Sequence, residues 1–174
     1  MTVFVALLRA INVGGTGKLS MKELAAVCTN LGLNKVRTHI QSGNVVFEST
    51  LSEESVRNKL ERALAEQMGK RIDVVVRTAS NLRLILEANP FPDAQPAKVA
   101  VVFLSGRLPL RLVNDLLIPG REEVRPGKRE VYIHYLDGMG RSKLKLPSSM
   151  GITTIRNINT VAKLVAMSRQ RTDS

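Results

Sequence analysis

Two apolar segments, VFVALLR (3–9) and KVAVVFLS (98–105), constrain the fold of this chain most, because each predicts a strand that is apolar on both faces. A strand in an antiparallel sheet with one face open to water alternates apolar and polar residues instead. The chain is therefore expected to form sheets that are covered on both faces. The second cover of each sheet is expected to be an extra helix or the other half of the chain.

The first half of the chain predicts a β-α-β-β-α-β order followed by an extra helix, because capping residues and a hairpin separate its apolar segments. Ser20 with Glu23 forms a capping box, and Ser42-Gly43 joins two strands by a short turn. This order is the split β-α-β, or ferredoxin-like, unit. The predicted elements are a strand (3–9), a helix from Ser20 to Gly32, strands (35–41 and 44–49), a helix from Ser52 to Gly69, a strand (72–78) and the extra helix (80–89).

The second half repeats this pattern in a shorter form. We therefore predict an α+β fold of duplicated ferredoxin-like units, each with an antiparallel sheet and an extra helix. The predicted domains are residues 1–89 and 98–174, joined by a proline-rich connector at 90–97. The predicted elements of the second half are a strand (98–105), a helix (108–117), a hairpin (122–126 and 129–136), a short irregular helix around Pro147 (142–151), a strand (152–156) and a closing helix (159–168).

Four segments, LLRAINVGG, VRTHIQSGNVVF, NPF and TIRNINTVAKL, closely resemble the domain-of-unknown-function 1697 family. Its members carry approximately LLRGINVGG, VRTYIQSGNVVF and TRNWNTVTKL, and the matches extend from Leu7 to about Leu164. The resemblance implies two ferredoxin-like repeats in bacterial cytoplasmic proteins that have no established biochemical role. The chain departs from the family at Ala10, His39 and Ile158, where the family has glycine, tyrosine and tryptophan. The last difference removes a large ring, which weakens any role for stacking there.

The segment NVGGTGK (12–18) lies between the first strand and a capped helix and is the main candidate binding site. Its spacing matches neither a Walker A loop nor a dinucleotide-binding fingerprint. Glycine backbone N–H groups beside a helix N-terminus can nevertheless hold an anion. In the ferredoxin-like strand order, the turn QSGN (41–44) lies at the same end of the sheet. The candidate ligand-binding residues are Asn12, Gly14, Gly15, Lys18, Gln41, Ser42 and Asn44, with Lys70, Arg71, Arg156 and Asn157 as secondary candidates.

The net charge of +11 favours an anionic partner, either nucleic acid or a phosphorylated small molecule. The leading interpretation is a binding protein for a phosphate-bearing ligand. One alternative is an enzyme acting on a phosphorylated metabolite, and another is a structural module that self-associates. A further alternative is that the glycines only allow positive φ and the basic side chains are only solvated.

Other classes of function have little support in the sequence. The central strands lack the aromatic residues of an RNA-recognition sheet. His39 and His134 have no partner at metal-ligand spacing, so neither a metal nor another cofactor is expected. Cys28 lies on the apolar face of its helix, and a single cysteine is typical of a cytoplasmic protein. No segment is long and apolar enough to span a membrane, so no membrane partner is expected.

Overall fold

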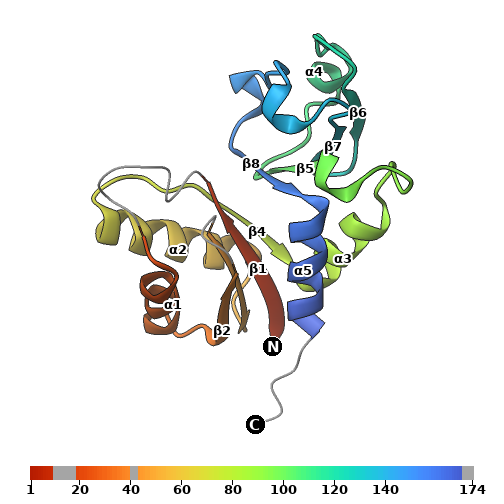
Figure 1. The fold of residues 1–174 in the computed structure, drawn as a ribbon. Helices are drawn as coiled ribbons and strands as arrows, with labels where there is room; N and C mark the ends of the chain where they lie inside the picture. Colours follow the sequence, from red (N-terminus) through yellow and green to blue (C-terminus); the bar gives the residue numbers. More distant parts are fainter. Residues whose placement is uncertain (10–18, 40–42, 170–174) are drawn as a thin grey trace. The chain divides into compact units, whose positions relative to one another are not determined.

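The computed structural model describes residues 1–9, 19–39 and 43–169, which form two compact units. Unit 1 comprises Met1–Arg83 together with the chain from Lys163, and unit 2 comprises Leu84–Ala162. Each unit contains one four-stranded antiparallel sheet with helices (Figure 1). The predicted α+β class is therefore confirmed.

Unit 1 has the strand order β2-β3-β1-β4, which is the order expected of a ferredoxin-like sheet. Figure 1 shows α1 and α2 on one face of this sheet and α5 on the other. Its elements are β1 (Thr2–Leu8), α1 (Met21–Asn30), β2 (Asn34–His39), β3 (Asn44–Ser49), α2 (Glu53–Met68), β4 (Val74–Thr78), the beginning of α3 (Ala79–Glu87) and the end of α5 (Ile158–Arg169).

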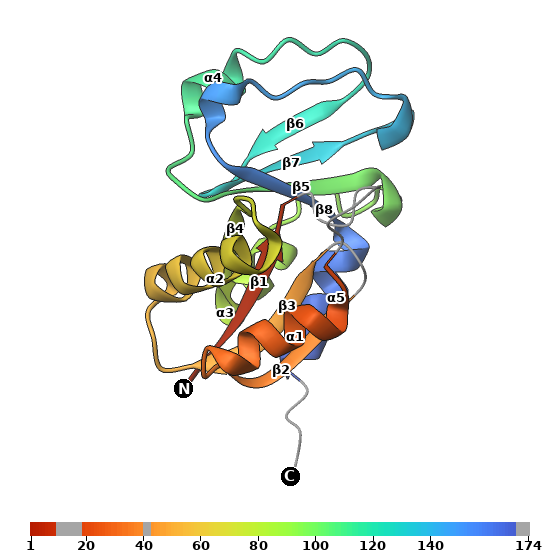
Figure 2. The same ribbon diagram turned by 90° about the vertical axis from the view of Figure 1, so that its left-hand side faces the viewer.

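Unit 2 repeats this order as β6-β7-β5-β8, so the predicted duplication is confirmed (Figure 2). The predicted irregular helix at 142–151 contains only one short 3-10 turn, because Pro147 lacks a backbone donor and fixes its own φ. The elements are η1 (Pro96–Lys98), β5 (Val99–Leu104), α4 (Leu110–Asn114), β6 (Glu123–Pro126), β7 (Glu130–His134), η2 (Met139–Arg141), η3 (Ser148–Met150) and β8 (Thr153–Asn157).

The helix ends in unit 1 follow the predicted capping residues. The Ser20 hydroxyl accepts a hydrogen bond from the Glu23 backbone N–H at 3.0 Å. The Ser52 hydroxyl accepts one from Ser55 N–H at 3.1 Å. Gly69 ends α2 with a φ of +68°, a conformation that glycine adopts without steric cost. These local interactions fix where each helix begins or ends.

The two units differ in the size of the helix layer on the first face of their sheets. In unit 1, Val56, Leu60 and Leu64 of α2 are fully buried against alternate residues of β1. In unit 2 the corresponding layer consists of the five-residue α4, of which only Val113 is buried, and the segment 142–151, of which only Met150 is buried. The first hydrophobic core is therefore the larger one.

The second face of each sheet is also buried, as the apolar strands predict. Val5 on β1 and Val101 on β5 point away from the first helix layers, and both are fully buried. In unit 1 this face meets the end of α5. In unit 2 the Tyr132 hydroxyl of β7 donates to the Ile85 carbonyl of α3 at 2.6 Å. Each sheet is thus covered by part of the helix that ends the other repeat.

One line of residues on the second face has arginine at both ends in each sheet, and we call it the transverse row. Directly opposed strand neighbours define each row, because side chains on adjacent strands at the same register share a face. The row of unit 1 is Arg77–Val5–Val46–Arg37, and that of unit 2 is Arg156–Val101–Tyr132–Arg125.

The edge strand β2 contains a β-bulge that β6 lacks. The register with β3 shifts between Asn34 and Arg37, and Lys35 has a φ of +49°. Lys35 is the only non-glycine residue with positive φ among residues 1–9, 19–39 and 43–169. Bulges add one residue to a strand and redirect the neighbouring side chains. Arg37 therefore follows Asn34 on the same face after three residues rather than two.

Candidate functional site

The sheet register of unit 1 brings together the two strand ends that precede and follow the predicted binding loops. Leu8 N–H donates to the Gly43 carbonyl at 2.8 Å, and Leu7 lies opposite Asn44. This confirms the predicted strand topology at that end of the sheet. Six candidates, namely Asn12, Gly14, Gly15, Lys18, Gln41 and Ser42, lie outside the described residues and stay a prediction.

Asn44 is the one main candidate that the structure describes. Its side chain is fully buried, and its Nδ2 donates to the His39 carbonyl at 3.0 Å. This bond links the residues on either side of the hairpin turn, as short polar side chains commonly do in turns. Asn44 therefore holds the hairpin end that carries Gln41 and Ser42.

Lys70 and Arg71 lie at the same end of the sheet. Arg9 N–H donates to the Asp73 carbonyl at 3.0 Å, which fixes the entry to β4 beside the end of β1. The Arg71 Nε lies 2.8 Å from Asp73 Oδ1, so an acid already partly neutralises that charge. Both basic side chains are exposed, and an exposed ion pair stabilises little.

Arg156 and Asn157 lie at the end of β8 in unit 2. Arg156 Nη1 donates to Thr154 Oγ1 at 2.8 Å and to the Ile155 carbonyl at 2.9 Å. Burial lowers the pKa of Arg156, although a guanidinium stays protonated at neutral pH. Asn157 Oδ1 accepts from Thr160 N–H at 2.9 Å and caps α5, a role that the sequence predicts for Asn157 or Asn159.

Cys28, His39 and His134 are the other titratable side chains that the sequence analysis considered. Burial raises the pKa of Cys28 to about 12, as expected of a core thiol. Burial, and then the nearby Lys163, lower the pKa of His39. His134 Nδ1 lies 3.5 Å from Glu123 Oε1. Within the part of the chain that is described, no three His, Cys, Asp or Glu residues form a group that could hold a metal ion.

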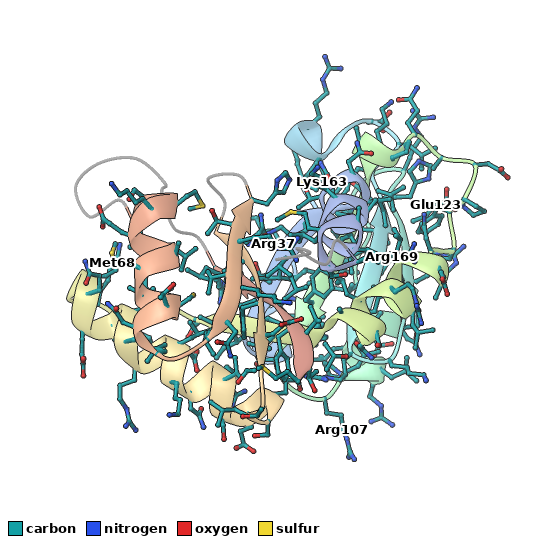
Figure 3. All side chains as sticks on the ribbon, turned by 90° about the horizontal axis from the view of Figure 1, so that it is seen from below. Arg37, Met68, Arg107, Glu123, Lys163 and Arg169 are labelled. Atoms are coloured by element: carbon teal, nitrogen blue, oxygen red, sulfur yellow. The ribbon has the colours of Figure 1, made fainter. Side chains whose placement is uncertain are left out.

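The sequence analysis missed Arg37 of the edge strand β2. Arg37 lies on β2 and Arg125 on β6, and both end a transverse row. The signal in the sequence is a Val-Arg pair in the second strand of each repeat, at 36–37 and 124–125. In Figure 3, Arg37 lies beside the helix that carries Lys163 and Arg169.

The comparison with protein families decides where this chain belongs. A family model described as "Protein of unknown function (DUF1697)" matches residues 1–132. The chain belongs to the DUF1697 family. The resemblance in its sequence motifs is thereby confirmed for the greater part of the chain.

A solved structure supports the fold of this DUF1697 protein over almost its whole length. It is the structure of a conserved bacterial protein from Streptococcus pneumoniae, with 29% sequence identity and a TM-score of 0.81. The match covers 97% of this chain and 99% of that one. A search of curated proteins gave no significant match. Among the described residues of this DUF1697 protein, no helix has the length and apolar character needed to cross a membrane.

Proposed function

We propose that this protein binds a phosphate-bearing anion at the end of unit 1 where the segment 12–18 and the turn 41–44 leave the sheet. The observation that carries the proposal is the Leu8 N–H to Gly43 carbonyl bond of 2.8 Å, because it joins the strands from which both segments extend. Glycine N–H groups beside the capped start of α1 suit an anion, and Lys18 adds a positive charge.

Lys70 and Arg71 support this proposal because they lie at the same strand end. A phosphate held there would gain from several positive charges at modest distance. The proposed setting is the cytoplasm, which the single buried cysteine supports. The ligand is either a phosphorylated small molecule or the backbone of a nucleic acid.

The test is a titration of the isotope-labelled full chain with a sugar phosphate, a nucleotide and an oligonucleotide, followed by amide chemical shifts. We expect shifts in residues 12–18 and 41–44. Lys18→Gln should weaken binding about tenfold, because a charged hydrogen bond contributes about 1.5–3 kcal/mol. Arg107→Gln is the matched control, because Arg107 lies between β5 and α4 of unit 2, in the segment that corresponds to the one between β1 and α1.

Unchanged amides at both segments with all three probes would disprove the proposal. Salt distinguishes the two ligand classes. The affinity for an oligonucleotide should fall steeply as the salt concentration rises, whereas the affinity for a single phosphate should fall modestly. Hydrolysis or transfer of the phosphate during the titration would favour the enzyme interpretation. Concentration-dependent light scattering at micromolar protein would favour the self-association module.

A further inference from the structure

A cavity of about 830 Å³ lies in unit 1, at the opposite end of the sheet from the segments 12–18 and 41–44. Its walls include the beginning of β1, the edge strand β2, the end of β3 and parts of α3 and α5. All of its lining residues belong to unit 1. The charged residues of this cavity are Lys35, Arg37, Glu48, Arg83 and Arg169.

The cavity is strongly basic, because four of these five charged side chains are cations. Lys35 Nζ lies 3.8 Å from Glu48 Oε2, so the only acid among the lining residues is already paired. The hydroxyl groups of Thr2, Ser80 and Ser168 add hydrogen-bonding capacity. Gathered positive charges repel one another, and an anion in their midst removes that cost.

Arg37 is the most informative residue of the cavity. Its Nε is buried and has no hydrogen-bond partner among the described residues. A buried polar group without a partner costs about 1–3 kcal/mol. A phosphate or carboxylate can accept two parallel hydrogen bonds from one guanidinium. Arg37 lines the cavity, so the part of its guanidinium that faces the cavity is suited to binding a planar pair of anionic oxygens.

The edge strand β2 supplies two cations to this cavity from alternate positions. Val36 packs into the hydrophobic core, while Lys35 and Arg37 both line the cavity. Residues at alternate positions of a strand share a face, and the bulge gives Lys35 a φ of +49°. Lysine rarely adopts positive φ, so the surroundings must hold this conformation at some cost.

We propose that this cavity is a second anion-binding site, specific for a small and multiply charged phosphate compound. Its volume lies in the range of about 300–1,000 Å³ that is usual for small-molecule sites. The only aromatic residue that lines it, Phe47, is fully buried and stacks on Phe4, so it offers no surface for a nucleic-acid base. The site uses none of the residues of the proposed function.

The test uses pyrophosphate as the probe and calorimetry on the full chain. Arg37→Gln should weaken binding about tenfold or more, and Arg37→Lys should weaken it less, because lysine keeps the charge but loses the two parallel bonds. Arg169→Gln should weaken binding about threefold, and no folding defect is expected because the Arg169 side chain is exposed. Arg125→Gln is the matched control at the same register in unit 2, and it should change affinity less than about twofold.

A second measurement separates binding from folding. Arg37→Met keeps an unbranched apolar stem but removes the charge and the buried donor, so it should abolish binding and leave the melting temperature equal or higher. A structural role for Arg37 would lower the melting temperature instead, and that result would overturn the proposal. Lys18→Gln should leave this binding unchanged, so the two proposed sites can fail independently.

Two further outcomes would also overturn the assignment. Equal losses in Arg37→Gln and Arg125→Gln would show that pyrophosphate responds only to overall charge. An RNA oligonucleotide that binds more tightly than pyrophosphate and protects surface beyond the cavity would replace the small phosphate compound as the ligand. Amide shifts confined to residues lining the cavity, lost in Arg37→Gln, would confirm the proposal.

Discussion

The edge strands of the two sheets place an arginine at the same end of the transverse row, yet the two arginines have different surroundings. Arg37 of unit 1 lines an open basic cavity, and its Nε has no partner among the described residues. Arg125 of unit 2 lies with its guanidinium carbon 5.9 Å from the centroid of the Phe91 ring and its Nη2 3.8 Å from Glu123. The edge-strand arginine thus faces an open basic cavity in unit 1, whereas in unit 2 it packs beside Phe91 and Glu123.

The residue that packs on Arg125, Phe91, comes from the proline-rich connector at 90–97. Phe91 lies between α3 and η1, and its ring centroid is 5.3 Å from that of His134, which itself lies near Glu123. The Phe91 ring and the Glu123 carboxylate lie beside the Arg125 guanidinium, and His134 lies beside both of them. No described residue offers a hydrogen-bond partner to Arg37 Nε. The comparison shows that a duplicated fold can have arginine at the same position in both repeats while only one of the two arginines packs against an aromatic ring.

The largest expected effect tests the unequal helix layers of the two units. Leu64→Ala in α2 should lower the free energy of unfolding by about 3 kcal/mol, because the side chain is fully buried. Leu112→Ala in α4 should lower it by about 1 kcal/mol, because Leu112 is only half-buried. Urea denaturation measures both. Equal losses would show that the short helix layer of unit 2 is as well packed as that of unit 1.

The next effect concerns Phe91, which packs on Arg125 in unit 2. Phe91→Ala should lower the free energy of unfolding by about 2 kcal/mol, because it removes a half-buried ring, its contact with His134 and its cation–π contact with Arg125. Phe91→Leu should lower the free energy of unfolding by less than half of this amount. Thermal and urea unfolding of both variants provide the measurement, and an unchanged melting temperature of Phe91→Ala would contradict the role assigned to the ring.

A smaller effect is expected at the third position of the transverse row, where unit 1 has Val46 and unit 2 has Tyr132. Tyr132→Phe should cost about 1 kcal/mol, because the hydroxyl donates to the Ile85 carbonyl and leaves that acceptor unsatisfied when removed. Tyr135→Phe is the matched control, since no hydrogen bond of its hydroxyl is found within the described residues. If both variants lost the same stability, the Tyr132 bond would have no special part in unit 2.

The smallest effect concerns His39, whose pKa is lowered by burial and then by Lys163. The unfolded chain binds this proton more readily than the folded one, so stability should fall as the pH drops through and below the ordinary histidine pKa. Lys163→Gln should raise the pKa of His39 only partly, because burial is the larger cause. A pH titration followed by histidine ring shifts tests this. A pKa of His39 above its ordinary value would contradict the expectation.

Most of the fold was predictable because its signals are local. Ser20, Ser52 and Gly69 mark helix ends by their own side-chain or backbone chemistry, and the apolar strands of both repeats predict two buried faces. The strand order follows from the ferredoxin-like pattern, and it correctly places the end of β1 beside Gly43. These features depend on residues close together in the chain or on a known connection rule.

The basic cavity was not predictable, because its residues are far apart in the sequence. Arg37 and Arg169 come together only because the end of α5 belongs to unit 1. The bulge had no signal either, since lysine is an uncommon residue at positive φ and neither glycine nor asparagine occupies position 35. Long-range packing and a strained backbone position are the kinds of feature that sequence patterns reveal least.

The extra residue in β2 has a genetic consequence. Removing the codon for Lys35 would bring Asn34 and Arg37 to the two-residue spacing that Glu123 and Arg125 have in β6. A single in-frame insertion or deletion is therefore sufficient to interconvert the edge geometries of the two repeats.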